Sequence, residues 1–187
     1  MDLLDIDRIA LDLNVALYAE LTDDEFDRPT PCAGWVVRDV LDHQVEQTLA
    51  FAAGARLGEP RAHDRANLVE EYARAADEVT AAFRADGLLD REAEFPDFGP
   101  MPGRNLVAVH FVDNLVHYWD VTRALGRAVV LDDRLAGAAH RIASRYPVTT
   151  SVRGPGSAFA MPVAVPEGAP VGDRLVGLLG RDPAWSA

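Results

Sequence analysis

The chain of 187 residues contains no lysine and only one cysteine, Cys32. Its positive charges are all arginines and its formal net charge is -12, which disfavours nucleic acid or an anionic membrane surface as a partner. A single cysteine excludes an internal disulfide and a cluster of thiolates, so a metal site here would use nitrogen and oxygen ligands. No run approaches the roughly 20 apolar residues of a membrane helix, and the first residues lack the pattern of a signal peptide. These absences predict a cytoplasmic protein that acts on a small molecule.

Apolar residues recur at intervals of three and four over most of the chain, which indicates amphipathic helices. The spacing predicts four long helices, over residues 3–21, 37–57, 64–85 and 103–126. We therefore expect an all-α fold, a four-helix bundle formed by residues 1–146. With 49% hydrophobic residues, a chain of this length suits one full hydrophobic core.

Proline and glycine mark the irregular parts of the chain. They are frequent over residues 88–103, which predicts a long ordered loop of the kind that often borders a site. A shorter fifth helix is expected over residues 132–146. Residues 147–187 are predicted to form an irregular C-terminal tail packed on the bundle, with a short strand at 159–165 and a helical turn or two at 173–179.

The most informative segment lies in the fourth predicted helix. His110, Asp113 and His117 are separated by three and four residues, which places them on one stripe of a helix. A buried carboxylate beside an imidazole needs a partner, and a divalent metal is one such partner. The alternative is a hydrogen-bonded core pair in which Asp113 simply orients His117.

A third ligand must come from another helix. His43 borders the apolar stripe of the second predicted helix, where one inward histidine can meet an Asp-x-x-x-His pair from a facing helix. His43, Asp113 and His117 are therefore the predicted metal ligands, although His43 is also compatible with a histidine bonded to a backbone carbonyl. His110 lies two turns, about 10 Å, from His117, so we assign it to the pocket wall or the second shell of the site.

Other residues receive less specific predictions. Cys32 precedes a helix whose dipole would favour a thiolate nucleophile, but a small buried residue in a turn is the interpretation we prefer. Trp35 and Trp119 are expected to pack in the bundle. Asp120 and Arg123 are expected to form an ion pair that contributes little by itself.

Two stretches, residues 30–43 (TPCAGWVVRDVLDH) and 116–126 (VHYWDVTRALG), resemble the mycothiol-dependent maleylpyruvate isomerase N-terminal family of the DinB/YfiT-like superfamily. Residues 173–183 are similar to an actinobacterial branch of it. The resemblance implies an up-down-down-up four-helix bundle in which His43 of the second helix and the pair Asp113 and His117 of the last hold a divalent ion. Relatives usually have Glu or His at position 113, and commonly Thr at position 36, where this chain has Val.

The resemblance implies a function as well. We expect a metal-dependent transferase or isomerase, with zinc or nickel as the ion and mycothiol as the thiol co-substrate acting on a small electrophile. Maleylpyruvate isomerisation itself does not transfer, because the characterised isomerase has a further C-terminal domain without an obvious counterpart in this tail. The alternative is a bundle that binds a metal or small ligand without turnover, or an interaction module. In either case a homodimer is expected to form through an exposed apolar face.

Overall fold

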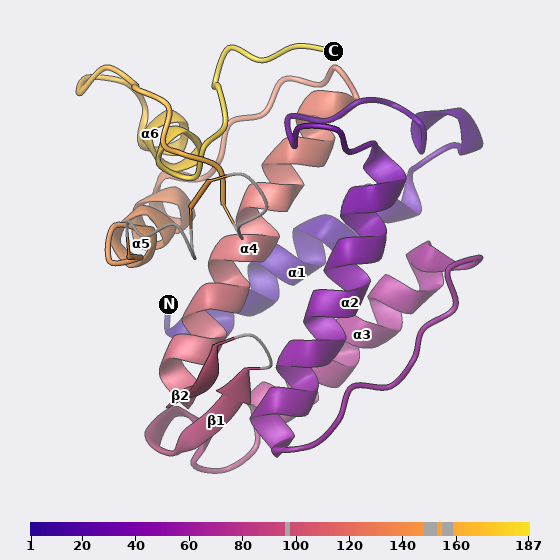
Figure 1. Cartoon of the computed structure of the whole chain (residues 1–187), viewed down its shortest axis with the longest axis vertical. Helices are drawn as coiled ribbons and strands as arrows, with labels where there is room; N and C mark the ends of the chain where they lie inside the picture. The colour runs from indigo at the N-terminus through magenta and orange to yellow at the C-terminus, as the bar shows by residue number, and fades with distance from the viewer. Residues whose placement is uncertain (96–97, 148–152, 155–158) are drawn as a thin grey trace.

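The computed structural model describes residues 1–95, 98–147, 153–154 and 159–187. Four long helices dominate it (Figure 1). Their bounds are α1 Leu3–Ala19, α2 Val37–Arg56, α3 Leu68–Phe83 and α4 Gly103–Ala124. Each lies within a few residues of its predicted range. The mostly helical fold expected from the spacing of apolar residues is therefore confirmed.

Contacts at one end of the bundle give the helix directions. Asp7, early in α1, is bonded to His110, early in α4, so these helices run the same way. The rings of Phe51 and Phe83, late in α2 and α3, pack on the His110 ring with centroids 4.9 and 5.2 Å away. The second and third helices thus run opposite to the first and fourth. This is the predicted up-down-down-up topology.

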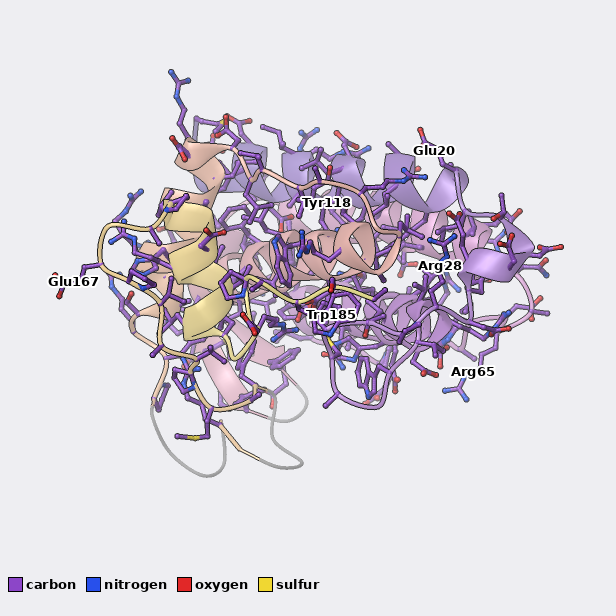
Figure 2. The ribbon with its side chains drawn as sticks, turned by 90° about the horizontal axis from the view of Figure 1, so that it is seen from above. Glu20, Arg28, Arg65, Tyr118, Glu167 and Trp185 are labelled. Carbon is purple, nitrogen blue, oxygen red and sulfur yellow. The ribbon has the colours of Figure 1, made fainter. Side chains whose placement is uncertain are left out.

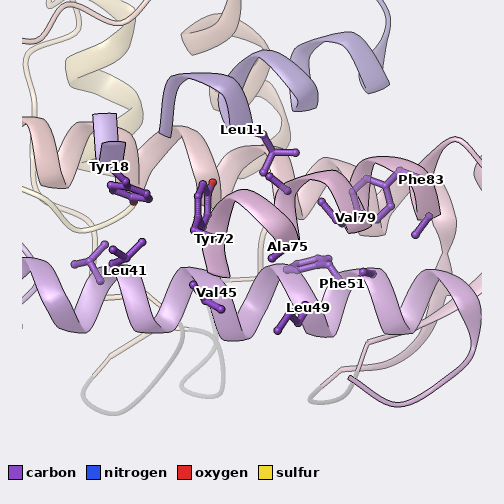
Figure 3. Close-up of a cluster of buried hydrophobic side chains, with 14 of the residues drawn as sticks. Leu11, Tyr18, Leu41, Val45, Leu49, Phe51, Tyr72, Ala75, Val79 and Phe83 are labelled. Atoms are coloured by element: carbon purple, nitrogen blue, oxygen red, sulfur yellow. The ribbon is translucent and has the colours of Figure 1, made fainter. Parts of the chain in front are cut away.

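Apolar side chains from α1, α2 and α3 fill the space between these helices (Figure 3). The Tyr18 and Tyr72 rings meet edge to face at 4.9 Å near one end. Their hydroxyls donate to a buried amide network, Tyr18 to Gln44 and Tyr72 to Asn114. Because buried polar groups are costly without partners, this network fixes how the helices pack beneath the candidate site.

Helix α2 begins after Val36, the position at which relatives commonly have Thr. Val36 occupies the N-cap position and offers no side-chain acceptor to the helix. Its backbone N–H instead donates to Asp39 Oδ2 at 2.9 Å. The carboxylate therefore stabilises the helix N-terminus, as expected for an acid in the first turn.

The predicted long loop at 88–103 contains regular structure that the sequence did not indicate. Strands β1 Glu92–Phe95 and β2 Gly99–Pro102 pair in antiparallel register, and short 3₁₀ turns lie at Leu88–Asp90 and, earlier in the chain, at Asp23–Glu25. Prolines are tolerated because both strands of a two-stranded sheet are edges. The hairpin packs on α2 at Gly54, where a Cβ would lie 1.7 Å from the Glu94 carbonyl oxygen.

Two further helices follow the bundle. They are α5 Asp133–Ala143, near its predicted range, and α6 Val171–Leu178. Asp132 caps α5 by accepting from the backbone N–H groups of Arg134 and Leu135. Both helices share a second apolar cluster with α1 and α4.

One prediction for the tail is wrong, and another is not tested. The strand expected at 159–165 is not formed: Phe159 makes an isolated bridge with Arg153, and residues 160–165 belong to no strand. The division of the chain into a bundle (1–146) and a tail (147–187) stays a prediction. No helix among the described residues is long and apolar enough to cross a membrane.

Candidate metal centre

Three potential ligands from two helices meet between α2 and α4. His43 on α2 and the pair Asp113 and His117 on α4 each offer one ligand atom, and these atoms all lie within 4.8 Å of one another. His117 Nε2 is 3.6 Å from Asp113 Oδ1, and the rings of the two histidines have centroids 5.2 Å apart. The spacing of four on α4 and the position of His43 on α2 therefore bring these side chains together as the sequence indicated. That they bind a metal stays a prediction.

The three side chains of the cluster differ in how much of their surface is exposed to solvent. The side chain of His117 is 6% exposed and that of Asp113 is 18% exposed. His43 is half-buried, and the Trp35 ring packs edge to face against it with centroids 5.1 Å apart. Trp35 is 36% exposed, so it covers the candidate site instead of packing inside the bundle, whereas Trp119 is buried as expected. Asp113 is therefore the more solvent-accessible member of the pair on α4.

The two histidines have opposite electrostatic environments. Burial lowers the pKa of His43 to about 4, with only partial compensation from Asp113. Burial also acts to lower the pKa of His117, but Asp113, Asp120 and Cys32 together raise it to about 10. At neutral pH, His43 therefore has a free lone pair, whereas His117 without a metal carries a proton between two carboxylates.

Asp120 contacts the far side of the His117 ring. Its Oδ2 is 3.0 Å from His117 Nδ1, and Arg181 binds both carboxylate oxygens, Nε to Oδ1 at 3.2 Å and Nη2 to Oδ2 at 2.9 Å. Burial opposes ionisation of Asp120, but Arg181 and His117 hold the pKa of that carboxyl well below its usual range. The contact is an ion pair and not a hydrogen bond of normal geometry, because His117 Nδ1 has no hydrogen-bond partner among the described residues. A carboxylate on this side of the imidazole restrains the ring while its other nitrogen faces His43 and Asp113.

The predicted partner of Asp120 was wrong. Arg123 lies over the Trp119 ring and donates to the backbone carbonyl of Trp185, while Asp120 pairs with Arg181. The chain after α6 runs back across α4 toward Trp185 (Figure 2). Arg181 lies on this stretch and contacts Asp120 of α4. Sequence reasoning missed Arg181 because 61 residues separate it from Asp120. Its place in the family-like segment at 173–183 was the only signal.

Cys32 joins this side of the site. Its Sγ lies 3.3 Å from Asp120 Oδ2 and 3.4 Å from Arg181 Nη2, and the thiol is partly buried. Ligand atoms of Cys32, His117 and Asp120 also lie within 4.8 Å of one another, so His117 belongs to two potential donor sets. Because a guanidinium already neutralises Asp120, the set containing His43 and Asp113 is the better site for a cation.

His110 lies two turns of α4 before His117, outside the cluster. Its Nδ1 is 2.6 Å from Asp7 Oδ1, and the rings of Phe51 and Phe83 pack against it. It belongs to neither of the two donor sets found among the described residues. No hydrogen bond or ring contact joins His110 to His43, Asp113 or His117 among the described residues. Its predicted place in the pocket wall or second shell of the site stays a prediction.

The residues present fit a divalent ion. Two imidazoles and one carboxylate are the ligand types that catalytic zinc sites use with an open position for water or substrate. Nickel also suits imidazole ligands. The Asp120 carboxylate behind His117 supplies the outer contact that metal-bound histidines usually have.

A surface hollow of about 480 Å³ lies along α2, and none of the three candidate ligands lines it. Glu46 and Gln47, three and four residues after His43, line it together with His63 and Phe95. Residues at these intervals share one face of a helix. The hollow therefore lies along α2 beyond His43, outside the ligand cluster, and Phe95 of β1 lines one side.

The fold and the donor arrangement define the class of protein: a DinB-like four-helix bundle with one histidine on the second helix and an acid–histidine pair on the fourth. The chain belongs to the mycothiol maleylpyruvate isomerase N-terminal domain family, whose sequence pattern matches residues 8–122.

The chain is similar in sequence to two mycobacterial proteins and similar in fold to one solved structure. An uncharacterised protein from each of two strains of Mycobacterium tuberculosis is 34% identical over 184 residues, which cover 97% of this chain and 98% of the relative. A crystal structure of a histidine-to-alanine mutant of the mycothiol-dependent maleylpyruvate isomerase superposes with a TM-score of 0.62. The superposition covers 77% of this chain and 68% of that one at 10% identity, so it shows a shared fold.

Proposed function

We propose that this protein is a divalent-metal-binding enzyme that uses a low-molecular-weight thiol of the mycothiol type to act on a small electrophile, as a transferase or an isomerase. The observation that carries the proposal is the convergence of His43, Asp113 and His117 within 4.8 Å. The family match over residues 8–122 supports a mycothiol-type thiol as the co-substrate. We propose zinc or nickel as the ion.

The chain's own groups have distinct roles in this proposal. His43 is neutral at pH 7 because burial lowers its pKa to about 4, so its nitrogen is available as a ligand. Asp120 contacts Nδ1 of His117, on the side of the ring away from the other two ligands. Asp113 supplies one negative charge to the ligand set. A divalent ion held there acts as a Lewis acid that lowers the pKa of a coordinated thiol, so that thiolate is available near neutral pH.

The electrophile is proposed to bind in the hollow along α2, whose lining begins at Glu46, three residues after His43. Its apolar wall includes Phe95 and Ala50, and its rim carries Glu46, Gln47 and Arg61. A small molecule with an apolar body and a few polar groups suits such a lining. In the reaction the thiol proton passes to solvent and the thiol sulfur bonds to an electrophilic carbon of the substrate. In a transfer, the bond from that carbon to its leaving group breaks and the leaving group departs with the electron pair. In an isomerisation, the sulfur adds to a C=C bond whose electron pair moves to a neighbouring electron-withdrawing group, and the C–S bond then breaks again to regenerate the thiol.

Zinc titration tests the metal part of the proposal. Isothermal titration and elemental analysis of wild type and of His43→Ala should show one zinc per chain in the first and strongly reduced uptake in the second. His140→Ala, which removes a histidine of α5 outside the cluster, is the matched control and should bind zinc like wild type. Equal and negligible uptake by all three proteins would remove the enzyme proposal.

A thiol assay tests the catalytic part. Zinc-loaded protein is mixed with mycothiol and a panel of small electrophiles, and free thiol is followed with time. Isomerisation regenerates the thiol, so substrate and product are also separated by chromatography. Turnover that His43→Ala lacks supports the proposal.

One observation favours the alternative of a bundle without turnover. In the absence of a metal, protonated His117 and Arg181 together balance the charges of Asp113 and Asp120, since these carboxylates raise the pKa of His117 to about 10. Such a cluster is stable as an ion-pair network and needs no ion. Zinc binding without turnover of any thiol and electrophile would support this alternative, and the expected homodimer stays a prediction in both cases.

A further inference from the structure

The two nitrogens of His117 face different carboxylates. Nε2 faces Asp113 Oδ1 at 3.6 Å on the side of His43, and Nδ1 faces Asp120 Oδ2 at 3.0 Å on the opposite side. His117 is 5% exposed and Asp120 is fully buried. The Nδ1 contact is an ion pair and not a hydrogen bond of normal geometry, so the position of the Asp120 charge restrains the direction in which His117 presents Nε2.

Arg181 fixes the Asp120 carboxylate through both oxygens, at 3.2 and 2.9 Å. This two-point contact restrains rotation of the carboxylate as well as its position, which a single bond does not. Arg181 is itself restrained, because its Nη1 donates to the Leu179 carbonyl oxygen at 2.8 Å and its side chain is buried. A line of contacts thus runs from Arg181 through Asp120 to His117.

The turn after α6 aims Arg181 at the bundle. Gly180 has φ +86 there, in the left-handed region, and a Cβ at this position would lie 2.6 Å from the Ala160 Cβ. Glycine permits both the conformation and the close approach. The last part of the chain therefore reaches α4 with a defined geometry.

We propose that Arg181 is a positioning residue for the metal centre: by holding Asp120 in two places it orients His117 so that Nε2 faces His43 and Asp113. This inference rests on the proposed function, because it concerns the same metal ligands. It adds that the segment after α6 completes the site, although the ligands themselves come from α2 and α4. Arg181 touches neither the ligand atoms of His43 nor those of Asp113 in the contacts described above.

Zinc affinity of Arg181→Gln tests the proposal. Glutamine cannot reproduce the charged two-point contact, so zinc affinity should fall by about 10- to 100-fold, the usual effect of removing an outer contact of a metal-bound histidine. Arg181→Lys keeps the charge but loses the two-point geometry and should give a smaller loss. The matched control is Arg153→Gln, which removes another buried arginine of the C-terminal segment whose Nη1 donates to the Leu178 carbonyl oxygen at 2.7 Å.

A double-mutant cycle and a cobalt spectrum separate positioning from general loosening. In the Asp120→Asn background, Arg181→Gln should cause little further loss of zinc affinity, because its effect passes through Asp120. The visible absorption of bound Co²⁺, which reports ligand geometry, should change in Arg181→Gln and not in Arg153→Gln. Circular dichroism identifies any variant that fails to fold, in which case Arg181→Lys completes the cycle.

The outcomes are distinct. If wild type binds zinc and Arg181→Gln binds it equally tightly, the role of Arg181 is overturned while the proposed function stands. An equal loss in Arg153→Gln, or a full further loss in the Asp120→Asn background, also overturns it. If wild type binds no zinc or nickel, the proposed function fails and this inference fails with it.

Discussion

Two histidines of α4, seven residues apart, are each buried against a carboxylate, but they have different surroundings. His110 has one acid, Asp7 at 2.6 Å, and aromatic walls from Phe51 and Phe83. His117 lies between Asp113 and Asp120 and faces a second imidazole. The comparison teaches that an acid–histidine pair alone is a packing device. A third donor on another helix is what makes a candidate ligand set.

The sharpest way to break this comparison is to exchange both histidines for glutamine. His117→Gln should weaken zinc binding by more than about 100-fold, because it removes a ligand and not only an orienting contact. His110→Gln should bind zinc like wild type. Zinc titration of the two purified variants checks this, and equal weakening in both would show that these two histidines do not differ in function.

The pH dependence of stability should also distinguish the two histidines of the cluster. The pKa of His117 in the folded metal-free protein, about 10, lies above its unfolded value of about 6.5, so its stabilisation is complete below pH 6.5 and is lost as pH rises through 10. The loss is on the order of several kcal/mol.

The effect of His43 on the pH dependence of stability has the opposite sign. Its folded pKa of about 4 lies below the unfolded value, so the unfolded chain takes up a proton first and stability is lost as pH falls from about 6.5 to 4. Urea unfolding between pH 4 and 10, with His43→Gln and His117→Gln as references, measures both effects. A wild-type profile parallel to that of His117→Gln above pH 6.5 would contradict the first.

Asp7→Ala sharpens the comparison at His110. The variant leaves His110 Nδ1 buried without its acceptor, and the free energy of unfolding should fall by about 1 to 3 kcal/mol. Asp12→Ala is the control, because Asp12 is 55% exposed in its pair with Arg8 and should cost at most about 1 kcal/mol. Chemical denaturation gives both values. Zinc affinity of Asp7→Ala should equal that of wild type.

The smallest expected effect concerns the identity of the acid in the cluster. Asp113→Glu introduces the acid more usual in the family pattern and should change zinc affinity by less than about tenfold, or 1.4 kcal/mol. Asp113→Asn removes the charge and should weaken binding more than Asp113→Glu changes it. Titration of the two variants side by side checks the order, and a reversed order would mean that Asp113 is not a ligand.

Local patterns predicted the helices well because each amphipathic stripe is a property of neighbouring residues. The helix bounds of α1, α2 and α4 fall within two residues of the predicted ranges. The hairpin formed by β1 and β2 was missed because its prolines indicate loops, whereas its packing on Gly54 and Phe51 of α2 is a tertiary contact that no local pattern shows. Arg181 was missed for a similar reason, since its partner Asp120 lies far away in the sequence.

The sequence by itself determined that four amphipathic helices form and that Asp113 and His117 share one face of the last, because hydrogen bonds and side-chain spacing within a helix are local. Only the tertiary structure decided which residues meet across helices: that His43 approaches His117, that Arg181 and not Arg123 pairs with Asp120, and that His110 is enclosed by phenylalanines. These contacts depend on helix directions and on the return of the C-terminal segment, which no short stretch of sequence encodes.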